Sequence, residues 1–364
     1  MGAPQEDART KVLYVLPFGQ PGGAESMVSR LLSGLAGSVD ASALLLDDGA
    51  FASSLRDGGI PVDVVPLPGK QGIARFPAAA RAAAGRHAGV DLIHANGTKG
   101  ALFGVLLARG LGVPIVWLKP DHFFDGRVAR AIARRCDRVV CVSEAMAAQF
   151  GPALADRVSV AYPGVALPAG VEAVGGDPLV VCAGRLDPLK GFDDLIRAVA
   201  VLRDRGIAAR IRICGPEDRM HPGYERVLRD LIADLGLDDR AEVLGWVDDY
   251  DAFIEGARLL ATASKPPKPG RPSEAAPTVL MDAMARGRPV VAQREPGTVE
   301  VVGDAGTLVD DPTPERLADA IEPYLVDRDL AEAAGRRGRE RAERLFDQRI
   351  TNERLRAVYA ELSG

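Results

Sequence analysis

The sequence has few cysteines and no long apolar run, and so lacks the features expected of disulfide-bonded, metal-binding and membrane-spanning proteins. It has four cysteines, all in or beside apolar runs and without the spacing of metal ligands, so we expect reduced thiols in the core. No apolar run approaches the roughly 18 residues that cross a membrane, and no signal peptide precedes Lys11. The expected compartment is therefore the cytoplasm. The cysteines are Cys136, Cys141, Cys182 and Cys214.

An excess of positive charge is also lacking. Lysine and arginine total 45 against 50 aspartates and glutamates, which gives a formal net charge of −5. A surface that binds nucleic acid would make its domain basic, so nucleic acid is not an expected partner. The apolar content of 47% is typical of a globular protein, and 364 residues suffice for two domains with separate cores.

Short apolar strands and helical patterns alternate along both halves of the chain. Alternation on this scale predicts an α/β fold with a parallel, doubly wound sheet in each half. A stretch rich in proline and glycine at 162–178 lacks either periodicity and is the expected linker. Residues 330–362 have the pattern of two helices broken near Asp347. The expected strands are 12–16, 43–46, 62–65, 92–94, 115–118 and 139–142 in the first half, and 179–183, 210–214, 241–244, 259–261, 289–292 and 307–309 in the second.

A strand-to-helix turn near the middle of the chain carries two cations. An apolar strand at 179–183 precedes Arg185 and Lys190, and helical spacing follows from Phe192 to Asp204. Such a turn directs free backbone N–H groups and the positive end of a helix dipole toward the space above the sheet, where an anion binds favourably. Two cations there would bind a diphosphate and stabilise it as it leaves.

Two carboxylates come from a different element. Glu274 is expected in a loop, and Asp282 in a helix that ends near Gly287. If the chain from Glu274 to Asp282 is all helical, eight steps with a rise of about 1.5 Å each separate the carboxylates by about 12 Å. They then cannot share one proton or one metal ion, and we expect them to contact two ends of one extended ligand.

Seven short motifs occur in order along the chain: Gly22-Gly23-Ala24-Glu25, Val142-Ser143-Glu144, Tyr162-Pro163-Gly164-Val165, Gly184-Arg185 with Lys190-Gly191, Cys214-Gly215-Pro216, Gly245-Trp246-Val247, and the acidic pair. Together they resemble glycosyltransferase family 4, which has the GT-B fold, over essentially the whole chain. The resemblance implies two Rossmann-like domains facing a central cleft, with the C-terminal helix crossing back to the first domain. It implies an acceptor-binding domain at 1–165, a nucleotide-sugar-binding domain at 166–345, and a returning helix at 346–364.

The resemblance also implies the reaction: retaining, metal-independent transfer of a sugar from a nucleoside-diphosphate sugar to a hydroxyl acceptor, with no cofactor. The acceptor is a small natural product, a saccharide or a lipid-linked glycan. Arg185 and Lys190 would hold the leaving diphosphate, Glu274 the transferred sugar, and Asp282 the ribose diol. The family usually has a glutamate at the last position, so the alternative is that Asp282 only caps or solvates its helix. Further expected donor-binding residues are Gly22, Gly23, Gly184, Gly215, Val247, Pro277, Thr278 and Val279.

A glycine-rich loop at 19–25 lies between the first expected strand and the first helix. The missing side chains of Gly22 and Gly23 would let backbone N–H groups approach a phosphate or acceptor oxygen closely. Glu25 is a candidate to bind the acceptor. The alternative is a tight turn with Glu25 in the first helical turn.

An acidic loop with one histidine follows the fifth expected strand. His122 matches the histidine-bearing loop of the family, in which the histidine lies near the reacting sugar, and is a candidate catalytic residue. Asp121 is a candidate to bind acceptor hydroxyls, while Asp125 either orients the imidazole or binds the acceptor. The alternative is a loop histidine packed beside Phe123 and Phe124.

Polar residues also follow the fourth expected strand. Asn96 and Thr98 are candidates to bind acceptor hydroxyls, since an amide suits hydroxyl recognition and not proton transfer. Family members commonly have His-x-His here, whereas this chain has His94-Ala95-Asn96. The alternative is that His94 is a core histidine and Asn96 a turn residue. His87 and His221 are expected at the surface, near helix ends.

Metal binding is not expected. Asp249 and Asp251 have the Asp-x-Asp spacing of metal-dependent glycosyltransferases, but their position favours the first turn of a helix. The basic, proline-rich loop at 264–273 contains Lys265, which would either reach an anionic ligand or be solvated.

A basic segment at 70–86 could form an amphipathic helix. Its large apolar side chains are Ile73 and Phe76 only, so we favour a surface helix and at most a peripheral membrane association. Two other classes of function stay open. They are a GT-B-shaped sugar-nucleotide epimerase or phosphorylase, and a non-catalytic protein that binds nucleotide sugars.

Overall fold

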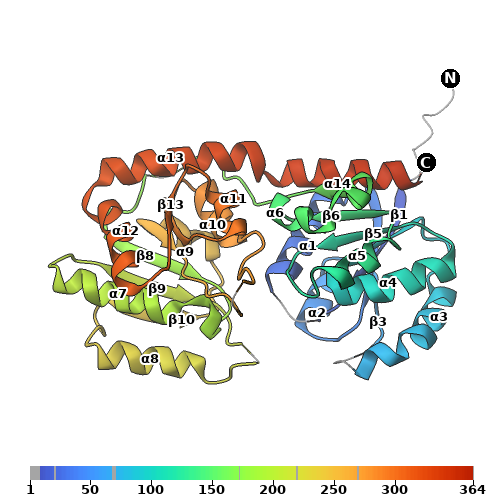
Figure 1. The fold of residues 1–364 in the computed structure, drawn as a ribbon, viewed down its shortest axis with the longest axis horizontal. Helices are drawn as coiled ribbons and strands as arrows, with labels where there is room; N and C mark the ends of the chain where they lie inside the picture. Colours follow the sequence, from blue (N-terminus) through green and yellow to red (C-terminus); the bar gives the residue numbers. More distant parts are fainter. Residues whose placement is uncertain are drawn as a thin grey trace. The chain divides into compact units, whose positions relative to one another are not determined.

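The computed structural model describes residues 9–19, 22–67, 71–171, 173–218, 220–268 and 270–363. The chain forms two compact units: it passes from the first unit to the second after Gly164 and returns to the first after Asp347. The first unit holds the residues up to Gly164 and those from Gln348 onward, and the second unit is Val165–Asp347 (Figure 1).

The first unit is built on a parallel sheet of seven strands in the order β3-β2-β1-β4-β5-β6-β7. The strand order reverses between β1 and β4, and ligands of open α/β sheets bind beyond the carboxyl ends of the strands at such a point. The strands are β1 Thr10–Leu16, β2 Val39–Leu45, β3 Val62–Val64, β4 Leu92–Asn96, β5 Ile115–Lys119, β6 Arg138–Cys141 and β7 Val158–Val160. The helices are α1 Gly23–Leu35, α2 Ala50–Asp57, η1 Gln71–Arg75, α3 Phe76–Arg86, α4 Gly97–Leu111, α5 Arg127–Ala133, α6 Glu144–Ala147, η2 Ala148–Phe150, η3 Pro152–Arg157 and α14 Gln348–Ser363.

The second unit repeats this architecture with six parallel strands in the order β10-β9-β8-β11-β12-β13. Its strand order reverses between β8 and β11, which defines a second switch point. The strands are β8 Leu179–Ala183, β9 Arg210–Cys214, β10 Ala241–Gly245, β11 Leu259–Ala261, β12 Val290–Gln293 and β13 Thr307–Val309. The helices are η4 Pro188–Lys190, α7 Phe192–Asp204, α8 Tyr224–Asp234, α9 Tyr250–Glu255, α10 Thr278–Ala285, α11 Pro296–Val302, α12 Pro314–Val326 and α13 Arg328–Leu345.

The last helix, α14, belongs to the first unit although α13 before it belongs to the second. Buried polar contacts attach it to the sheet. The Tyr359 hydroxyl on α14 lies 2.6 Å from His94 Nδ1 on β4 and 3.2 Å from the Tyr14 hydroxyl on β1. His94 is fully buried, which makes it a core histidine, one of the two alternatives that the sequence left open. Burial disfavours the charged imidazolium and lowers the pKa of His94 to about 3.

The buried His94 predicts a specific loss of stability in acid. Its pKa is about 3 in the folded protein and near 6.5 as a free side chain, so its contribution is fully present above pH 6.5 and is lost as the pH falls toward 3. Between pH 7.5 and pH 5 we expect this residue to cost about 2 kcal/mol of unfolding free energy. Urea denaturation of the wild type and of His94→Gln at both pH values measures the difference. Equal pH dependence in the two proteins would contradict the assignment.

The four cysteines are free and buried, as the sequence predicted. Burial raises the pKa of Cys136, Cys141 and Cys214 to about 12, so these thiols are poor nucleophiles. Among the described residues, none of the helices has the length and apolar character needed to cross a membrane. A cytoplasmic location stays a prediction.

Candidate functional site

The switch point of the second unit joins two motifs that are far apart in sequence. Lys190 lies in the turn after β8, and Glu274 lies in the loop after β11, the neighbouring strand. Lys190 Nζ donates to Glu274 Oε1 at 2.6 Å, and the Ser264 hydroxyl donates to the same oxygen at 2.7 Å. The structure therefore brings these two predicted residues into direct contact at a carboxyl edge of a parallel sheet.

Arg185 lies at the same edge, immediately after β8. Its side chain is 55% exposed, and its guanidinium lies 3.6 Å from Asp187 Oδ2 and 3.5 Å from Asp218 Oδ1. Both carboxylates are buried. Asp187 also accepts from Leu189 N at 2.9 Å, and His221 Nδ1 lies 2.8 Å from Asp218 Oδ2. The two acids thus hold the guanidinium while most of it stays open to a ligand.

These same acids form a group with metal-ligand spacing. In the described ranges, Asp187, Asp218 and His221 are the one set whose ligand atoms all lie within 4.8 Å of one another. The guanidinium of Arg185 lies beside both carboxylates and supplies positive charge there, and metal independence stays a prediction. The sequence treated His221 only as a surface residue, since nothing local connects it to the turn after β8.

Gly184 and Gly215, two of the residues predicted to bind the donor, have a packing role. Gly215 has φ +146°, and a Cβ there would lie 1.8 Å from the Gly184 carbonyl oxygen. Gly184 itself has φ +155°. These residues let the turns after β8 and β9 approach closely. Contact of either glycine with the donor stays a prediction, as does that of Val247, which is half-buried after β10.

The N-terminus of α10 has no side-chain cap from its N-cap residue, Pro277. Thr278 and Val279 form its first turn, where N–H groups without a partner in the helix can bind an anion, and a contact of these residues with the donor stays a prediction. Because the helix begins only at Thr278, the separation of about 12 Å expected for a wholly helical segment does not apply. The prediction that the acids contact two ends of one ligand stays untested.

Asp282 lies on α10 and is 4% exposed. The guanidinium of Arg286, also 4% exposed, lies 3.9 Å from Asp282 Oδ1. Arg286 in turn contacts Asp251 and lies 3.7 Å from Glu255 on α9. Asp249 caps α9 by accepting from Ala252 N at 2.9 Å. Asp249 and Asp251 are thus a helix start and an ion-pair partner, the interpretation that the sequence favoured over a metal site.

A carboxylate that the sequence did not single out holds the loop of Glu274. Glu295 Oε2 accepts from Ser273 N at 2.7 Å, from the Ser273 hydroxyl at 2.6 Å and from Glu274 N at 3.3 Å. Glu295 also forms a capping box with Thr298 at the start of α11. A glutamate followed by proline at the first helical position was the local signal for this cap.

The basic loop at 264–273 is only partly solvated. Lys265 Nζ lies 3.0 Å from Asp193 Oδ1 and 2.8 Å from Asp194 Oδ2, and its side chain is 38% exposed, so a contact of Lys265 with an anionic ligand stays a prediction. Both acids lie at the start of α7. Lys268 and Arg271 are exposed, and Pro269 lies outside the described residues.

In the first unit, the acidic loop after β5 surrounds a buried lysine. Lys119 Nζ contacts Asp125 Oδ1 at 2.7 Å, and the other carboxylate oxygen lies 2.7 Å from His122 Nδ1. Asp125 therefore orients the imidazole, one of the two roles expected for it. Asp121 Oδ1 accepts from Phe123 N at 2.9 Å, and burial raises the pKa of Asp121.

The two acceptor candidates after β4 are buried. Thr98 is 4% exposed and donates its hydroxyl proton to the Phe123 carbonyl at 3.1 Å, so it shapes the loop of His122. Asn96 is 1% exposed and precedes α4. Neither presents an open hydroxyl or amide in this structure, and a contact with the acceptor stays a prediction for both.

The glycine-rich loop after β1 leads into α1. A Cβ on Gly22 would lie 2.6 Å from Glu25 Oε2, whereas Gly23 has open space around it. Glu25 is in the first turn of α1 and is 7% exposed. Gln20 and Pro21 of this loop lie outside the described residues.

The basic segment at 70–86 is a surface helix with a buried face. Phe76, at the start of α3, packs edge-on against Phe103 with ring centroids 5.4 Å apart, and Ala80 and Ala83 are buried. Of its two large apolar side chains, Phe76 is thus buried in the core, whereas Ile73 is 42% exposed, and a peripheral membrane association stays a prediction. Lys70 lies outside the described residues.

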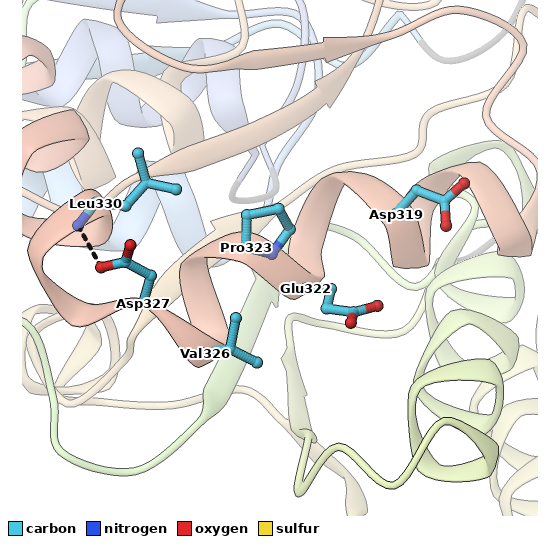
Figure 2. Close-up of a pocket in the computed structure, with 6 residues that line it drawn as sticks. All are labelled: Asp319, Glu322, Pro323, Val326, Asp327 and Leu330. Carbon is cyan, nitrogen blue, oxygen red and sulfur yellow. Dashed lines mark hydrogen bonds between the residues drawn. The ribbon is translucent and has the colours of Figure 1, made fainter.

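A cavity of about 390 Å³ on α12 and α13 contains none of the predicted site residues (Figure 2). Its acids already have partners: Arg205 pairs with Asp319 at 2.8 Å and with Glu322 at 2.9 Å, and Asp327 caps α13 through Leu330 N. The two switch points, where cations, acids and helix ends meet, are the better candidates for a site.

Comparison with known families and structures decides the classification. The family model for Glycosyl transferases group 1 matches residues 167–341, and that for Glycosyltransferase Family 4 matches residues 21–167. Together the two matches cover residues 21–341, and the chain is a family 4-like glycosyltransferase. A crystal structure of Anabaena HepE with UDP and glucose superposes with a TM-score of 0.81 at 24% identity, covering 97% of this chain and 100% of that one. The predicted GT-B fold is thereby confirmed.

The curated relatives match this chain over only part of their length. A GDP-mannose-dependent alpha-(1-6)-phosphatidylinositol monomannoside mannosyltransferase of Mycobacterium tuberculosis is 32% identical over 58% of this chain and 60% of the relative. A D-inositol 3-phosphate glycosyltransferase of Saccharomonospora viridis is 31% identical over 75% of this chain and 65% of the relative. The chain thus spans less than two thirds of the length of either relative.

Proposed function

We propose that this family 4-like chain transfers a sugar from a nucleoside-diphosphate sugar to a hydroxyl acceptor, with retention of configuration and without a metal ion. The observation that carries the proposal is the contact of Lys190 with Glu274 beside Arg185 at the β8–β11 switch point. Two cations can neutralise a diphosphate while the carboxylate accepts hydrogen bonds from sugar hydroxyls. The second unit would therefore bind the donor, and the first unit the acceptor.

The relatives support this substrate class. One is named for GDP-mannose as its donor, and solved structures of HepE contain UDP and UDP-glucose. The curated relatives are named for inositol phosphate and phosphatidylinositol mannoside, both of which carry ring hydroxyls. A hydroxyl on a small natural product, a saccharide or a lipid-linked glycan is the acceptor we propose.

The reaction needs stabilisation of charge on the leaving diphosphate. We propose that Arg185, Lys190 and the N–H groups at the start of α10 supply it. Carboxylates already hold the two cations, and donors positioned in advance lower a barrier most effectively. With retention, the leaving phosphate helps to deprotonate the acceptor hydroxyl on the same face of the sugar. Glu274 then acts by holding the sugar and not as a covalent nucleophile.

Metal independence gives a direct test. In an assay of sugar transfer, EDTA is expected to leave the rate nearly unchanged, because the charge of the diphosphate is balanced by Arg185 and Lys190. A loss of activity that Mg²⁺ or Mn²⁺ restores would contradict this expectation. It would direct attention to Asp187, Asp218 and His221, whose ligand atoms lie within 4.8 Å of one another.

Dependence of turnover on the acceptor separates the proposal from its rivals. A transferase releases nucleoside diphosphate in step with addition of acceptor. An epimerase converts the donor without any acceptor, and a non-catalytic protein binds the donor without turnover. A phosphorylase would instead require inorganic phosphate or a sugar phosphate.

A further inference from the structure

A lysine with no exposed surface lies at the end of β5. The Lys119 side chain is 0% exposed, and its ammonium contacts the Asp121 carbonyl at 2.6 Å, the Phe123 carbonyl at 3.2 Å and Asp125 Oδ1 at 2.7 Å. The ammonium donates hydrogen bonds to the two carbonyls and forms an ion pair with the Asp125 carboxylate. Burial of a charge is costly unless it is paired in this way. All three acceptors belong to the loop that carries His122.

The loop is held from several other directions. The Thr98 hydroxyl donates to the Phe123 carbonyl at 3.1 Å, and Phe123 N donates to Asp121 Oδ1 at 2.9 Å. Phe124 has φ +56°, a left-handed conformation that is strained for a side chain of this size. Such strain persists only where the surroundings determine the backbone, so the loop has a fixed shape.

Asp125 connects the buried ammonium to the imidazole. Burial alone would raise the pKa of Asp125, but hydrogen bonds from His122 and Lys119 outweigh it and hold the pKa at about 2. The carboxylate is therefore ionised near neutral pH and only accepts hydrogen bonds. At 2.7 Å, His122 Nδ1 must be the donor. A neutral ring then has its proton on Nδ1 and a lone pair on Nε2.

We propose that Lys119 and Asp125 are positioning residues that fix His122 in the Nδ1–H tautomer and present Nε2 as a hydrogen-bond acceptor to a substrate hydroxyl. The proposal rests on the proposed transferase function, which supplies the hydroxyl. Lys119 fixes which oxygen of Asp125 faces the ring, and Asp125 fixes which nitrogen of the ring carries the proton.

The variant Asp125→Asn tests this with little change of shape. Lys119 needs an acceptor, so the amide oxygen turns to the ammonium and the NH₂ group faces His122 Nδ1. That donor requires the opposite tautomer, with the proton on Nε2, and Nε2 then no longer accepts. We expect a fall in kcat on the order of 10²-fold, with the donor KM changed by less than about threefold.

Long-range ¹H–¹⁵N NMR of the four histidines reports the tautomer directly, at a pH where the rings are neutral, and His122→Gln assigns the signal. We expect Nδ1–H in the wild type and Nε2–H in Asp125→Asn. Asp63→Asn is the matched control, because Asp63 Oδ2 lies 3.0 Å from His87 Nε2 in a similar pair. The control should leave the His122 signal and kcat unchanged. Lys119→Met should disturb the same signal as Asp125→Asn.

Two results would overturn the proposal: an Nε2–H tautomer of His122 in the wild type, or an Asp125→Asn variant with unchanged tautomer and kcat. The NMR measurement needs no activity. A protein with the Nδ1–H tautomer but no transfer under any condition would contradict the transferase function alone.

Discussion

Arg185→Ala and Lys190→Ala are each expected to lower the turnover number by about 10²–10³-fold, the usual cost of one preorganised donor that stabilises developing charge. Arg185 is 55% exposed and Lys190 30% exposed, so neither side chain contributes much to the core. The melting temperature should therefore change by only a few degrees, roughly the effect of 1 kcal/mol or less. Steady-state kinetics and a thermal melt of the same preparations measure both quantities.

The matched control is Arg212→Ala. Arg212 lies on β9 of the same sheet, is 42% exposed and lies 3.2 Å from Glu242 on the neighbouring strand β10. It should keep wild-type turnover. Activity within threefold of wild type in both Arg185→Ala and Lys190→Ala would remove their role in holding the leaving group.

Glu274→Gln and Asp282→Asn are expected to separate the two ends of the donor. If Glu274 holds the sugar and Asp282 the ribose, Glu274→Gln weakens binding of the sugar nucleotide and spares the bare nucleoside diphosphate. Asp282→Asn should weaken both ligands. A hydrogen bond to a charged group contributes about 1.5–3 kcal/mol, or roughly 10–150-fold in dissociation constant, which calorimetry resolves.

Asp282 is buried beside Arg286, so Asp282→Asn could act by moving Arg286 instead of by removing a contact with the ligand, and a control is needed. Asp251→Asn removes another carboxylate that contacts Arg286, without changing Asp282 itself. If Asp251→Asn reproduces the loss seen in Asp282→Asn, the effect comes from the position of Arg286 and α10, and the assignment of the ribose to Asp282 is wrong. Equal losses for both ligands in Glu274→Gln would contradict its assignment to the sugar.

The central strands could be predicted from sequence because parallel strands covered by helices on both faces form continuous apolar runs. The fully buried strands β8 and β11 begin and end at the predicted residues, and so do the partly buried strands β9 and β13. The edge strand β7 was missed, since its three residues are only partly buried and leave no apolar run. The break between α13 and α14 near Asp347 was also predicted, and the structure confirms it.

Site residues could be predicted where the charged side chains and the turn that positions them lie in one short stretch of sequence. Arg185 and Lys190 flank a turn whose strand and helix are both evident from periodicity. The residues that hold them are not evident, because their partners follow other strands. Asp218 reaches Arg185 only because β9 lies beside β8, and Glu295 reaches the loop of Glu274 from the start of α11.

Burial was the second limit on prediction from sequence. Asn96 and Thr98 have the residue types of hydroxyl ligands, yet both are nearly inaccessible. Lys265 has the charge to bind an anion, yet Asp193 and Asp194 neutralise it. Lys119 is the last residue of β5, one position beyond the predicted strand 115–118, and no local pattern showed that its ammonium organises the loop after β5.

Equilibrium titration of UDP, GDP and dTDP in the presence of EDTA tests most directly whether Arg185 and its neighbours hold a nucleoside diphosphate. We expect saturable binding of at least one of them to the wild type and to Arg212→Ala. Arg185→Ala should bind about tenfold more weakly or worse, since a charge-assisted hydrogen bond contributes about 1.5–3 kcal/mol. Absence of saturable binding for all three nucleotides, or equal affinity in all three proteins, would contradict the account.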